Sequence, residues 1–326
     1  MKESSPKVSI IIPLYNSERF ISTSIDSAIT QTWINKEIII VDDGSKDNSL
    51  EFAKKFKAEN VRIFSQKKSG ASSARNRAFK ESTGQYIQYL DSDDILAPDK
   101  IEKQLLQLKT EQADTIASGP FFNFKETIEN FESNVRDEGN TSFNNPVDWL
   151  IKAASDKAMF PTVVWLTPRK LIEEAGPWNE GLTYNDDSEF FSRVILMSKK
   201  IVFCEDAISF YRRGNPNSLG SQKSIIARKS EFDSLSLVTE HLLKFEDSVR
   251  VRRACSYQYN KLYYSLYPSS KSVRTEVKDK LIELGSYEKF EFGHGFTSKI
   301  GKLIGWKTAM WLRYYILKIL KFRFIL

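Results

Sequence analysis

The first 118 residues alternate short apolar runs with segments of helical periodicity, and this alternation restricts the chain to an α/β fold. Apolar runs of four or five residues are typical of strands buried on both faces. They occur at residues 8–12, 37–41, 61–64 and 86–90, and helical segments at about 17–29, 50–56, 71–80 and 98–109. We expect Ser17 to cap the first helix and Pro98 to open the last. This order predicts a Rossmann-like, mainly parallel sheet with helices on both faces.

Two acidic clusters follow the second and fourth predicted strands. Asp42 and Asp43 precede Gly44, and Asp91-Ser92-Asp93-Asp94 follows the run at 86–90. Because the carboxyl ends of parallel strands meet at one edge of the sheet, both clusters are expected at the edge where such folds bind ligands. Each could also be a solvated turn, since Asp, Ser and Gly are common turn residues.

The spacing of Asp91 and Asp93 suits a divalent cation. Alternate residues of an extended chain point the same way, so the two carboxylates can share one ion. Mg²⁺ and Mn²⁺ take oxygen ligands, usually one or two carboxylates together with phosphate and water oxygens. The pattern therefore predicts a Mn²⁺ or Mg²⁺ site at Asp91 and Asp93 that would bind a diphosphate. Asp94 could assist or could cap the following turn.

Between the two clusters lies a segment rich in small residues, SGASSARN at 69–76. Small side chains let a ligand approach the backbone closely, and a helix that begins near Gly70 would favour an anion. Arg75 could bind a phosphate. Alternatively, the segment is a tightly packed helix with a surface arginine.

Taken together, four motifs resemble those of the family 2 glycosyltransferases, inverting enzymes of the GT-A fold. They are PLYN at 13–16, VDDGS at 41–45, SGASSARNRA at 69–78 and YLDSDD at 89–94, and Gln31 and Glu37 also match. The resemblance covers about residues 6–110, continues more weakly through 173–193 and fades beyond about 220. It implies that a hexose or N-acetylhexosamine passes from a nucleotide-sugar, most often a UDP-sugar, to a hydroxyl of a glycan or lipid-linked acceptor in polysaccharide biosynthesis.

The resemblance also implies a set of donor-binding residues. Those expected at the nucleotide base are Pro13, Tyr15 and Asp43, with Glu18 nearby. Those expected at the nucleotide, diphosphate and metal are Arg75, Asn76, Asp91, Ser92 and Asp93.

For the catalytic base, the resemblance points to the segment DDSEFFSR at 186–193. The family usually has Glu-Asp here, and its second acid takes the proton of the acceptor hydroxyl. That position is Asp187, and the first is Asp186 in place of Glu. Many members also carry a histidine after Tyr-Arg near the diphosphate, whereas this chain has Arg212 and Arg213 and no histidine there. Either arginine could supply the positive charge, or the loop could serve packing alone.

The remaining sequence predicts three parts: a glycosyltransferase domain at 1–220, a helical appendage at 221–295 and a basic amphipathic helix at 296–326. Residues 119–160 are expected to form loops and short strands. From Phe292 to Leu326 there are seven Lys or Arg and no acidic residue. These cations alternate with Trp, Tyr, Ile and Leu, which favours an anionic membrane surface over nucleic acid, although the helix could instead pack on the protein. No apolar run reaches the roughly 18 residues of a membrane span.

Several other functions are disfavoured. Two cysteines and two histidines, all far apart, offer neither a zinc site nor a Cys-His pair. The absence of a GxGxxG after the first strand disfavours a dinucleotide-dependent dehydrogenase. A sugar nucleotidyltransferase would need a Gly-rich basic loop there, and an inactive scaffold would be expected to lose the acidic residues that are present. The start of the chain lacks a signal-peptide pattern, so we expect a cytoplasmic protein bound peripherally to the inner face of the plasma membrane.

Overall fold

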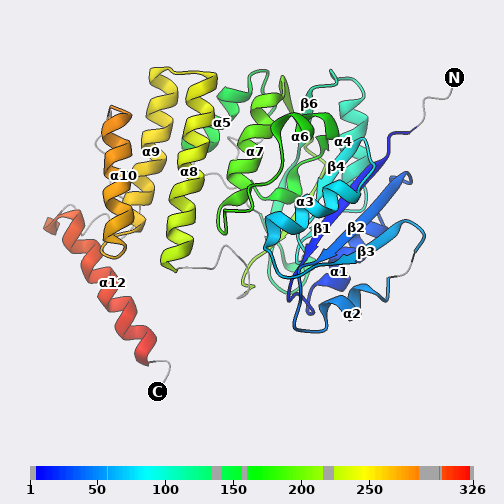
Figure 1. Cartoon of the computed structure of the whole chain (residues 1–326), viewed down its shortest axis with the longest axis horizontal. Coiled ribbons are helices and arrows are strands. Elements are labelled where there is room, and N and C mark those ends of the chain that lie inside the picture. Colours follow the sequence, from blue (N-terminus) through cyan, green and yellow to red (C-terminus); the bar gives the residue numbers. More distant parts are fainter. Residues whose placement is uncertain are drawn as a thin grey trace. The chain divides into compact units, whose positions relative to one another are not determined.

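The computed structural model describes residues 5–56, 58–133, 141–155, 160–215, 224–285, 301 and 303–323. The chain forms two compact units, Met1–Gln222 and Lys223–Leu326 (Figure 1). The expected three-part division stays a prediction.

The first unit is built on a five-stranded sheet with the order β3-β2-β1-β4-β9. Its strands are β1 (Val8–Leu14), β2 (Lys36–Asp42), β3 (Val61–Ser65), β4 (Tyr86–Tyr89) and β9 (Thr167–Pro168). The first four are parallel, and only β9 runs antiparallel, against β4. Every residue of β1 is buried, as a strand covered on both faces requires. The predicted α/β class with a mainly parallel sheet is confirmed.

The helices of this half are α1 (Ile21–Ile29), α2 (Ser49–Ala53), α3 (Ala71–Glu81) and α4 (Lys100–Leu108). The expected cap at Ser17 is wrong: its carbonyl accepts from the amides of Phe20 and Ile21 and closes a turn before α1. Pro98 does not open α4 either, because Asp99 is the N-cap and the Pro98 carbonyl accepts from the Thr32 amide at 2.8 Å. At both places, a carbonyl of the segment before the helix accepts a hydrogen bond from a backbone amide, so it is satisfied outside the helix.

Two smaller sheets complete the unit, one of β10 and β6, the other with the order β5-β11-β7-β8. Their strands are β5 (Ile95–Leu96), β6 (Thr115–Ser118), β7 (Phe121–Phe124), β8 (Glu132–Ser133), β10 (Lys200–Phe203) and β11 (Ser209–Arg212). The other elements are η1 (Ile128–Asn130), η2 (Thr162–Val164), α5 (Pro146–Ser155), α6 (Arg169–Ala175) and α7 (Asp186–Met197).

Helix α5 corrects the expectation of only loops and short strands at 119–160. The signal was present: Pro146 is the first helical residue, and Asn145 Oδ1 accepts from the Val147 amide at 2.9 Å, as an N-cap does. The helix is held by burial of Val147, Trp149 and Leu150, which a window without clear period does not reveal.

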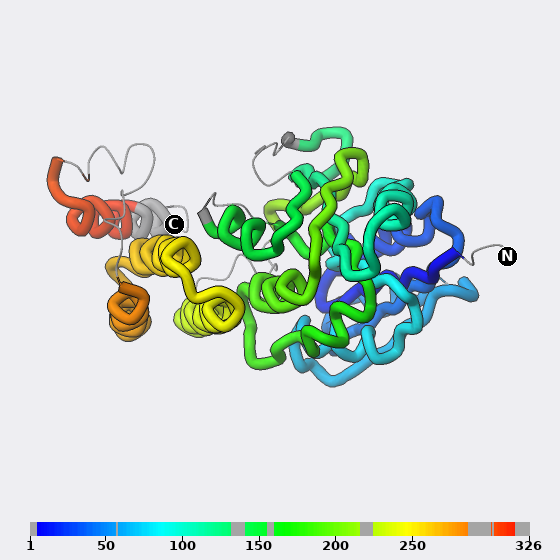
Figure 2. Tube along the Cα trace, turned by 90° about the horizontal axis from the view of Figure 1, so that it is seen from above, coloured from blue at the N-terminus to red at the C-terminus, as the bar shows by residue number. Residues whose placement is uncertain are grey.

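The second unit contains α8 (Ile225–Phe245), α9 (Val249–Ser265), α10 (Lys271–Glu283) and α12 (Trp306–Arg323). Helices α8, α9 and α10 lie side by side (Figures 1 and 2). Ser224 and Ser248 cap α8 and α9 through their side chains. None of the helices in the described part of the chain is long and apolar enough to cross a bilayer.

Candidate active site

The two acidic clusters stand at the carboxyl ends of the parallel strands. Leu14 of β1 pairs with Asp42 of β2, and the Asp43 amide donates to the Leu14 carbonyl at 2.8 Å. On the other side of β1, Ile11 pairs with Tyr89, and Asp91 follows two residues later. The register therefore brings both acidic clusters to one edge of the sheet, as the sequence predicted.

Asp43 organises the loop that leads into α3. Its Oδ1 accepts from Gln66 Nε2 at 2.9 Å and from the Ser69 amide at 2.8 Å, and its Oδ2 accepts from the Gly70 amide at 2.7 Å. Gly70 has φ +102, which a side chain would strain. Asp43 is buried, so much of its hydrogen-bonding capacity shapes this loop.

The other residues expected at the nucleotide base surround that loop. Lys68 Nζ donates to the Tyr15 hydroxyl at 2.7 Å and lies 4.2 Å from the centre of its ring. Glu18 Oε2 accepts from the amide and the side chain of Asn48, both at 2.9 Å. Pro13 is buried within β1, so its ring shapes this surface, and its carbonyl is the one polar group that it can offer.

Arg75 links the two sides of the site. Its guanidinium donates to Asp91 Oδ1 at 2.7 Å and to Asp186 Oδ2 at 3.0 Å, and lies 4.4 Å from the Trp178 ring centre. Burial alone would lower the pKa of Arg75, but the charges of Asp91 and Asp186 outweigh it and raise that pKa. Ser72 Oγ donates to the same Asp186 oxygen at 2.7 Å. Helix α3 is thereby tied both to the end of β4 and to the start of α7.

Asn76 fastens the segment that carries Trp178. Its Nδ2 donates to the Trp178 carbonyl at 2.9 Å and to Glu180 Oε1 at 2.8 Å, and its Oδ1 accepts from the Trp178 amide at 2.8 Å. Trp178 in turn stacks on Phe190 of α7 with ring centres 4.0 Å apart. Asn76 thus positions the indole beneath Arg75.

The DxD segment concentrates negative charge. Burial and the charge of Asp91 raise the pKa of Asp93, although a 2.7 Å hydrogen bond from Asn215 Nδ2 to its Oδ2 opposes them. Asp94 is fully enclosed, and burial together with Asp93 and Asp91 raises its pKa well above the usual value. Ser92 Oγ shares a 2.7 Å hydrogen bond with Ser17 Oγ, which fixes the loop to the turn after β1.

A divalent cation fits the chemistry of this segment. The side chain of Asp91 is 30% exposed, and burial raises the pKa of the nearby Asp93 carboxyl, so a cation bound here would favour the ionised form of Asp93. No cluster of three or more His, Cys, Asp or Glu with metal-binding geometry occurs among the described residues. Two carboxylates alone are the ordinary protein contribution to a Mg²⁺ or Mn²⁺ that also binds phosphate.

Asp187 lies in the first turn of α7, after Asn185 in a left-handed conformation with φ 59. Its Oδ1 accepts from the Ser188 amide at 2.8 Å. Burial and then the charge of Asp186 raise the pKa of Asp187 to about 6, against the opposing effects of the Ser188 amide and Arg75. A carboxylate with a pKa near 6 is a stronger base than an ordinary aspartate and is still ionised at neutral pH.

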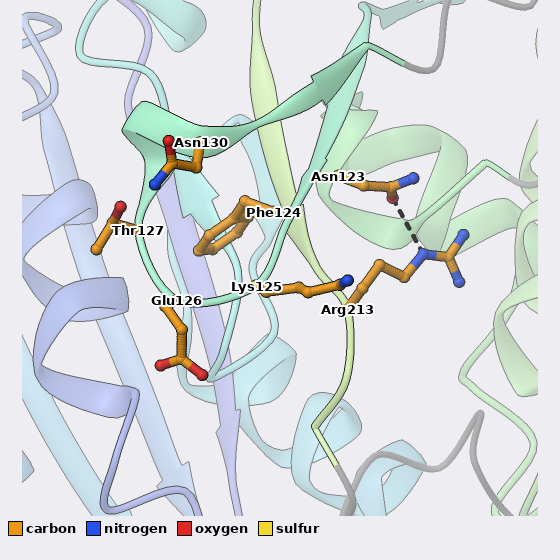
Figure 3. Close-up of a pocket in the computed structure, with 7 residues that line it drawn as sticks. All are labelled: Asn123, Phe124, Lys125, Glu126, Thr127, Asn130 and Arg213. Carbon is orange, nitrogen blue, oxygen red and sulfur yellow. Dashed lines mark hydrogen bonds between the residues drawn. The ribbon is translucent and has the colours of Figure 1, made fainter.

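The two arginines of β11 and its end differ in role. Arg212 donates from Nε to the Asp93 carbonyl at 2.9 Å and from Nη1 to the Lys125 carbonyl at 2.5 Å, and lies over the rings of Phe20 and Phe124. It therefore packs the DxD loop against β7. Arg213 donates from Nε to Asn123 Oδ1 at 3.1 Å at the edge of a hollow (Figure 3).

The model of the family described as Glycosyl transferase family 2 matches residues 9–159. The chain is 30% identical over 274 residues to the cholesterol galactosyltransferase of Borreliella burgdorferi, across 80% of this chain and 73% of that one. It is also 30% identical over 216 residues to the glycosyltransferase GlyG of Streptococcus pneumoniae, across 64% and 71%. The chain belongs to the family 2 glycosyltransferases.

Other similarities agree with this assignment. The chain is 39% identical over 170 residues to the uncharacterized glycosyltransferase YibD of Escherichia coli, and this match spans about half of that protein, 49%, and 51% of this chain. Among solved structures, S. aureus TarS 1–349 in complex with UDP is similar with a TM-score of 0.65 and 16% identity, over 85% of this chain and 80% of that one. At that identity the likeness shows the GT-A fold, which confirms the predicted fold.

Within this glycosyltransferase fold, the sequence motifs did not indicate several of the contacts that build the site. They are Lys68 on Tyr15, Trp178 under Arg75, Asp186 opposite Arg75, and Asn215 on Asp93. Trp178 and Asp186 stood within the motif at 173–193, so that motif was the available signal. Lys68 and Asn215 had none, because their partners are 53 and 122 residues away in the chain.

Proposed function

We propose that this family 2 glycosyltransferase transfers a hexose or N-acetylhexosamine from a UDP-sugar, with inversion, to a hydroxyl of a glycan or lipid-linked acceptor. Asp91 and Asp93 bind the Mn²⁺ or Mg²⁺ of the donor complex, and Asp187 removes the acceptor proton. The observation that carries this proposal is the Arg75 bridge, which ties the DxD carboxylate Asp91 to Asp186, the neighbour of Asp187.

The bridge supports the mechanism because transfer requires the donor and the base at fixed positions relative to each other. Asp187 accepts the proton of the attacking hydroxyl, and its raised pKa favours that transfer. A bound divalent cation would supply the positive charge that stabilises the leaving diphosphate. Asp91 and Asp93 orient that ion, and Tyr15 and Asp43 contact the base at the neighbouring strand ends.

The choice of a uridine donor is supported by two observations. Asp43 directly follows β2 at the sheet edge where Tyr15 follows β1, and a carboxylate there can accept the imide N–H of uracil. Structures of the similar S. aureus TarS hold UDP and UDP-GlcNAc.

The test uses purified protein and a panel of UDP- and GDP-sugars, because many glycosyltransferases slowly hydrolyse their donor without an acceptor. Binding and hydrolysis are measured with Mn²⁺, with Mg²⁺ and with EDTA. Asp93→Asn is expected to abolish metal-dependent binding, and Asp187→Asn to retain binding but lose transfer. Asp26→Asn is the matched control, since Asp26 is an exposed carboxylate of α1. If no nucleotide-sugar binds under any condition, the donor site is refuted and a non-catalytic scaffold becomes the better explanation.

We also propose that α12 holds the protein on the inner face of the plasma membrane. Residues 311–316 are all exposed, and they include Trp311, Leu312, Arg313, Tyr315 and Ile316. Exposed aromatic and aliphatic side chains beside cations are typical of helices that lie in an anionic leaflet. Lys299 and the side chains of Lys302, Lys318 and Lys321 lie outside the described residues.

Co-sedimentation with vesicles tests this part of the proposal. Binding is expected to phosphatidylglycerol vesicles, to weaken in salt and to fall in Trp311→Ser. Equal recovery with and without vesicles would refute it.

A further inference from the structure

Aromatic rings join the start of α12 to the end of α9. Trp306, the first residue of α12, packs against three tyrosines, two in the last turn of α9 and one just after it. Its ring centre lies 4.4 Å from that of Tyr264, 5.3 Å from that of Tyr267 and 6.0 Å from that of Tyr263. The ring planes meet at 67–77°, the edge-to-face arrangement that aromatic pairs favour. The cluster therefore fixes where α12 begins.

Two cations of α10 stand over the outer two of these tyrosines. The guanidinium carbon of Arg274 lies 4.7 Å from the Tyr267 ring centre, and Lys278 Nζ lies 5.8 Å from the Tyr263 ring centre. Both distances are within the range of a cation–π interaction. The two cations are four residues apart, so they share one face of α10. The tyrosine rings thus hold two positive charges one helical turn apart, beside the start of α12.

Neither cation has an acidic partner in the part of the chain that the structure describes. Among those residues, Arg274 Nη1 is buried without a hydrogen-bond partner, and Lys278 is exposed and forms neither a hydrogen bond nor an ion pair. The carboxylate of Glu276 is turned toward α8, where Lys229 Nζ donates to its Oε2 at 2.6 Å. Asp279 lies about 100° further round the helix than Lys278. A buried donor without an acceptor is unfavourable, so an anion bound to the guanidinium would offset that cost.

The next part of α12 indicates what kind of anion reaches these cations. Residues 311–316 are all exposed, and six consecutive residues cover every side of a helix with 3.6 residues per turn. Three of the six are Trp or Tyr, residues that concentrate at the headgroup level of a bilayer. Trp306 precedes Trp311 by about 7 Å along the helix, at 1.5 Å per residue. A headgroup layer that meets these exposed rings therefore comes within reach of Arg274 and Lys278.

From these contacts we infer that the junction of α9, α10 and α12 binds the phosphate of an anionic phospholipid. We call it the junction site, and it consists of Tyr263, Tyr267, Arg274, Lys278 and Trp306. The planar guanidinium donates two parallel hydrogen bonds to the phosphate, and the ammonium adds a second positive charge. The inference rests on the membrane part of the proposed function. It adds recognition of one chemical group to the general attraction of cations for an anionic leaflet.

The test separates a phosphate site from general charge attraction. The full-length protein is titrated with two kinds of phosphatidylcholine vesicle, one containing phosphatidylglycerol and the other cholesteryl hemisuccinate, whose anionic group is a carboxylate. The amounts are adjusted until both vesicles have the same surface potential, and binding is measured by co-sedimentation. General attraction depends on that potential alone, so it is equal for both. The unmodified protein is expected to bind the phosphatidylglycerol vesicles about ten-fold or more tightly, as charge-assisted hydrogen bonds to one phosphate would produce.

The variants assign the preference to residues. Arg274→Gln and Lys278→Gln are each expected to reduce it to about two-fold, and Arg274→Lys should recover part of it. Because Lys278 is exposed, Lys278→Gln tests the site even where Arg274→Gln lowers the melting temperature. Lys244→Gln is the matched control, since Lys244 is an exposed lysine of α8 that pairs with Glu240. The control should keep the full preference for phosphatidylglycerol.

Three outcomes overturn the inference. The first is equal binding of the unmodified protein to both kinds of vesicle, and the second is a preference that both charge-removing variants keep. The third is release from phosphatidylglycerol vesicles by millimolar inorganic phosphate at constant ionic strength, which would assign the site to a soluble anion. Failure of the proposed function looks different. A protein that binds neither kind of vesicle refutes the membrane proposal itself, whereas binding without preference refutes the junction site alone.

Discussion

Replacing Arg75 by methionine should both destabilise the first unit and alter its pH dependence. Arg75 is 5% exposed and pairs with Asp186, 10% exposed, and with Asp91, 30% exposed. Removing one partner of a buried ion pair costs about 3–5 kcal/mol, because a buried charge loses its compensation. Since Asp91 can be partly hydrated, we expect a loss of about 3 kcal/mol. For a unit of this size that corresponds to a fall in Tm of about 6–12 °C.

The electrostatic consequence is separate from the loss of stability. Arg75 lowers the pKa of Asp187, whereas Asp186 and Asp91 raise it. Without Arg75 the pKa of Asp187 rises, so the acidic limb of the kcat profile should move to higher pH. A variant that merely loosened the fold would reduce the folded fraction without moving this limb.

The assay combines calorimetry with pH-dependent transfer for Arg75→Met, Asp186→Asn and the double variant. The double variant should be more stable than the sum of the two losses predicts, because the two residues contact each other. Arg77→Met is the control, since Arg77 makes an exposed hydrogen bond to the Ser65 carbonyl, and its effect should stay below about 1 kcal/mol. Additive losses together with an unmoved pH profile would refute the bridge between Asp91 and Asp186.

Three further predictions concern titratable groups. Transfer should increase with pH through about 6 and then level off, because Asp187 with a pKa of about 6 must be ionised to accept a proton; a flat kcat profile from pH 5 to 8 would exclude it as the base. Glu37→Gln should lower the free energy of unfolding by about 2–3 kcal/mol at pH 7 in urea, because hydrogen bonds from Ser9, Thr83 and Lys7 outweigh burial and hold the Glu37 pKa at about 2. This contribution is complete above the unfolded pKa of 4.5 and is lost as pH falls toward 2. An equal loss in the variant at pH 3 and pH 7 would contradict it. Lys100 is fully buried beside the Gln88 side chain, and burial lowers its pKa, so the unfolded state binds more protons and the free energy of unfolding should rise with pH below the ordinary lysine pKa of 10.5. Lys100→Met should remove this pH dependence and stabilise the fold at pH 7. Unchanged urea midpoints of the unmodified protein at pH 6 and pH 9 would contradict the reasoning.

The strand positions were predictable because each contains a run of apolar residues that covers both faces, as within Val8–Leu14 and Lys36–Asp42. The first residues of the helices were less predictable. Ser17 has the side chain of a cap, yet its hydroxyl bonds Ser92 instead, and α1 starts only at Ile21. A local pattern cannot register a competitor 75 residues away.

In the candidate site too, some features follow from the local sequence and others from long-range contacts. Local order along the chain determined the parallel sheet, the edge at which Asp43, Asp91 and Asp93 gather, and the family motifs that single out Asp187. These depend on hydrophobic period and on the fact that parallel strands end together. Only the tertiary structure decided that Arg75 pairs with Asp91 and Asp186 and that Arg212 packs under the DxD loop. Such pairings join residues 16 to 119 positions apart, and burial, which sets their strength and their pKa values, exists only once the chain has folded.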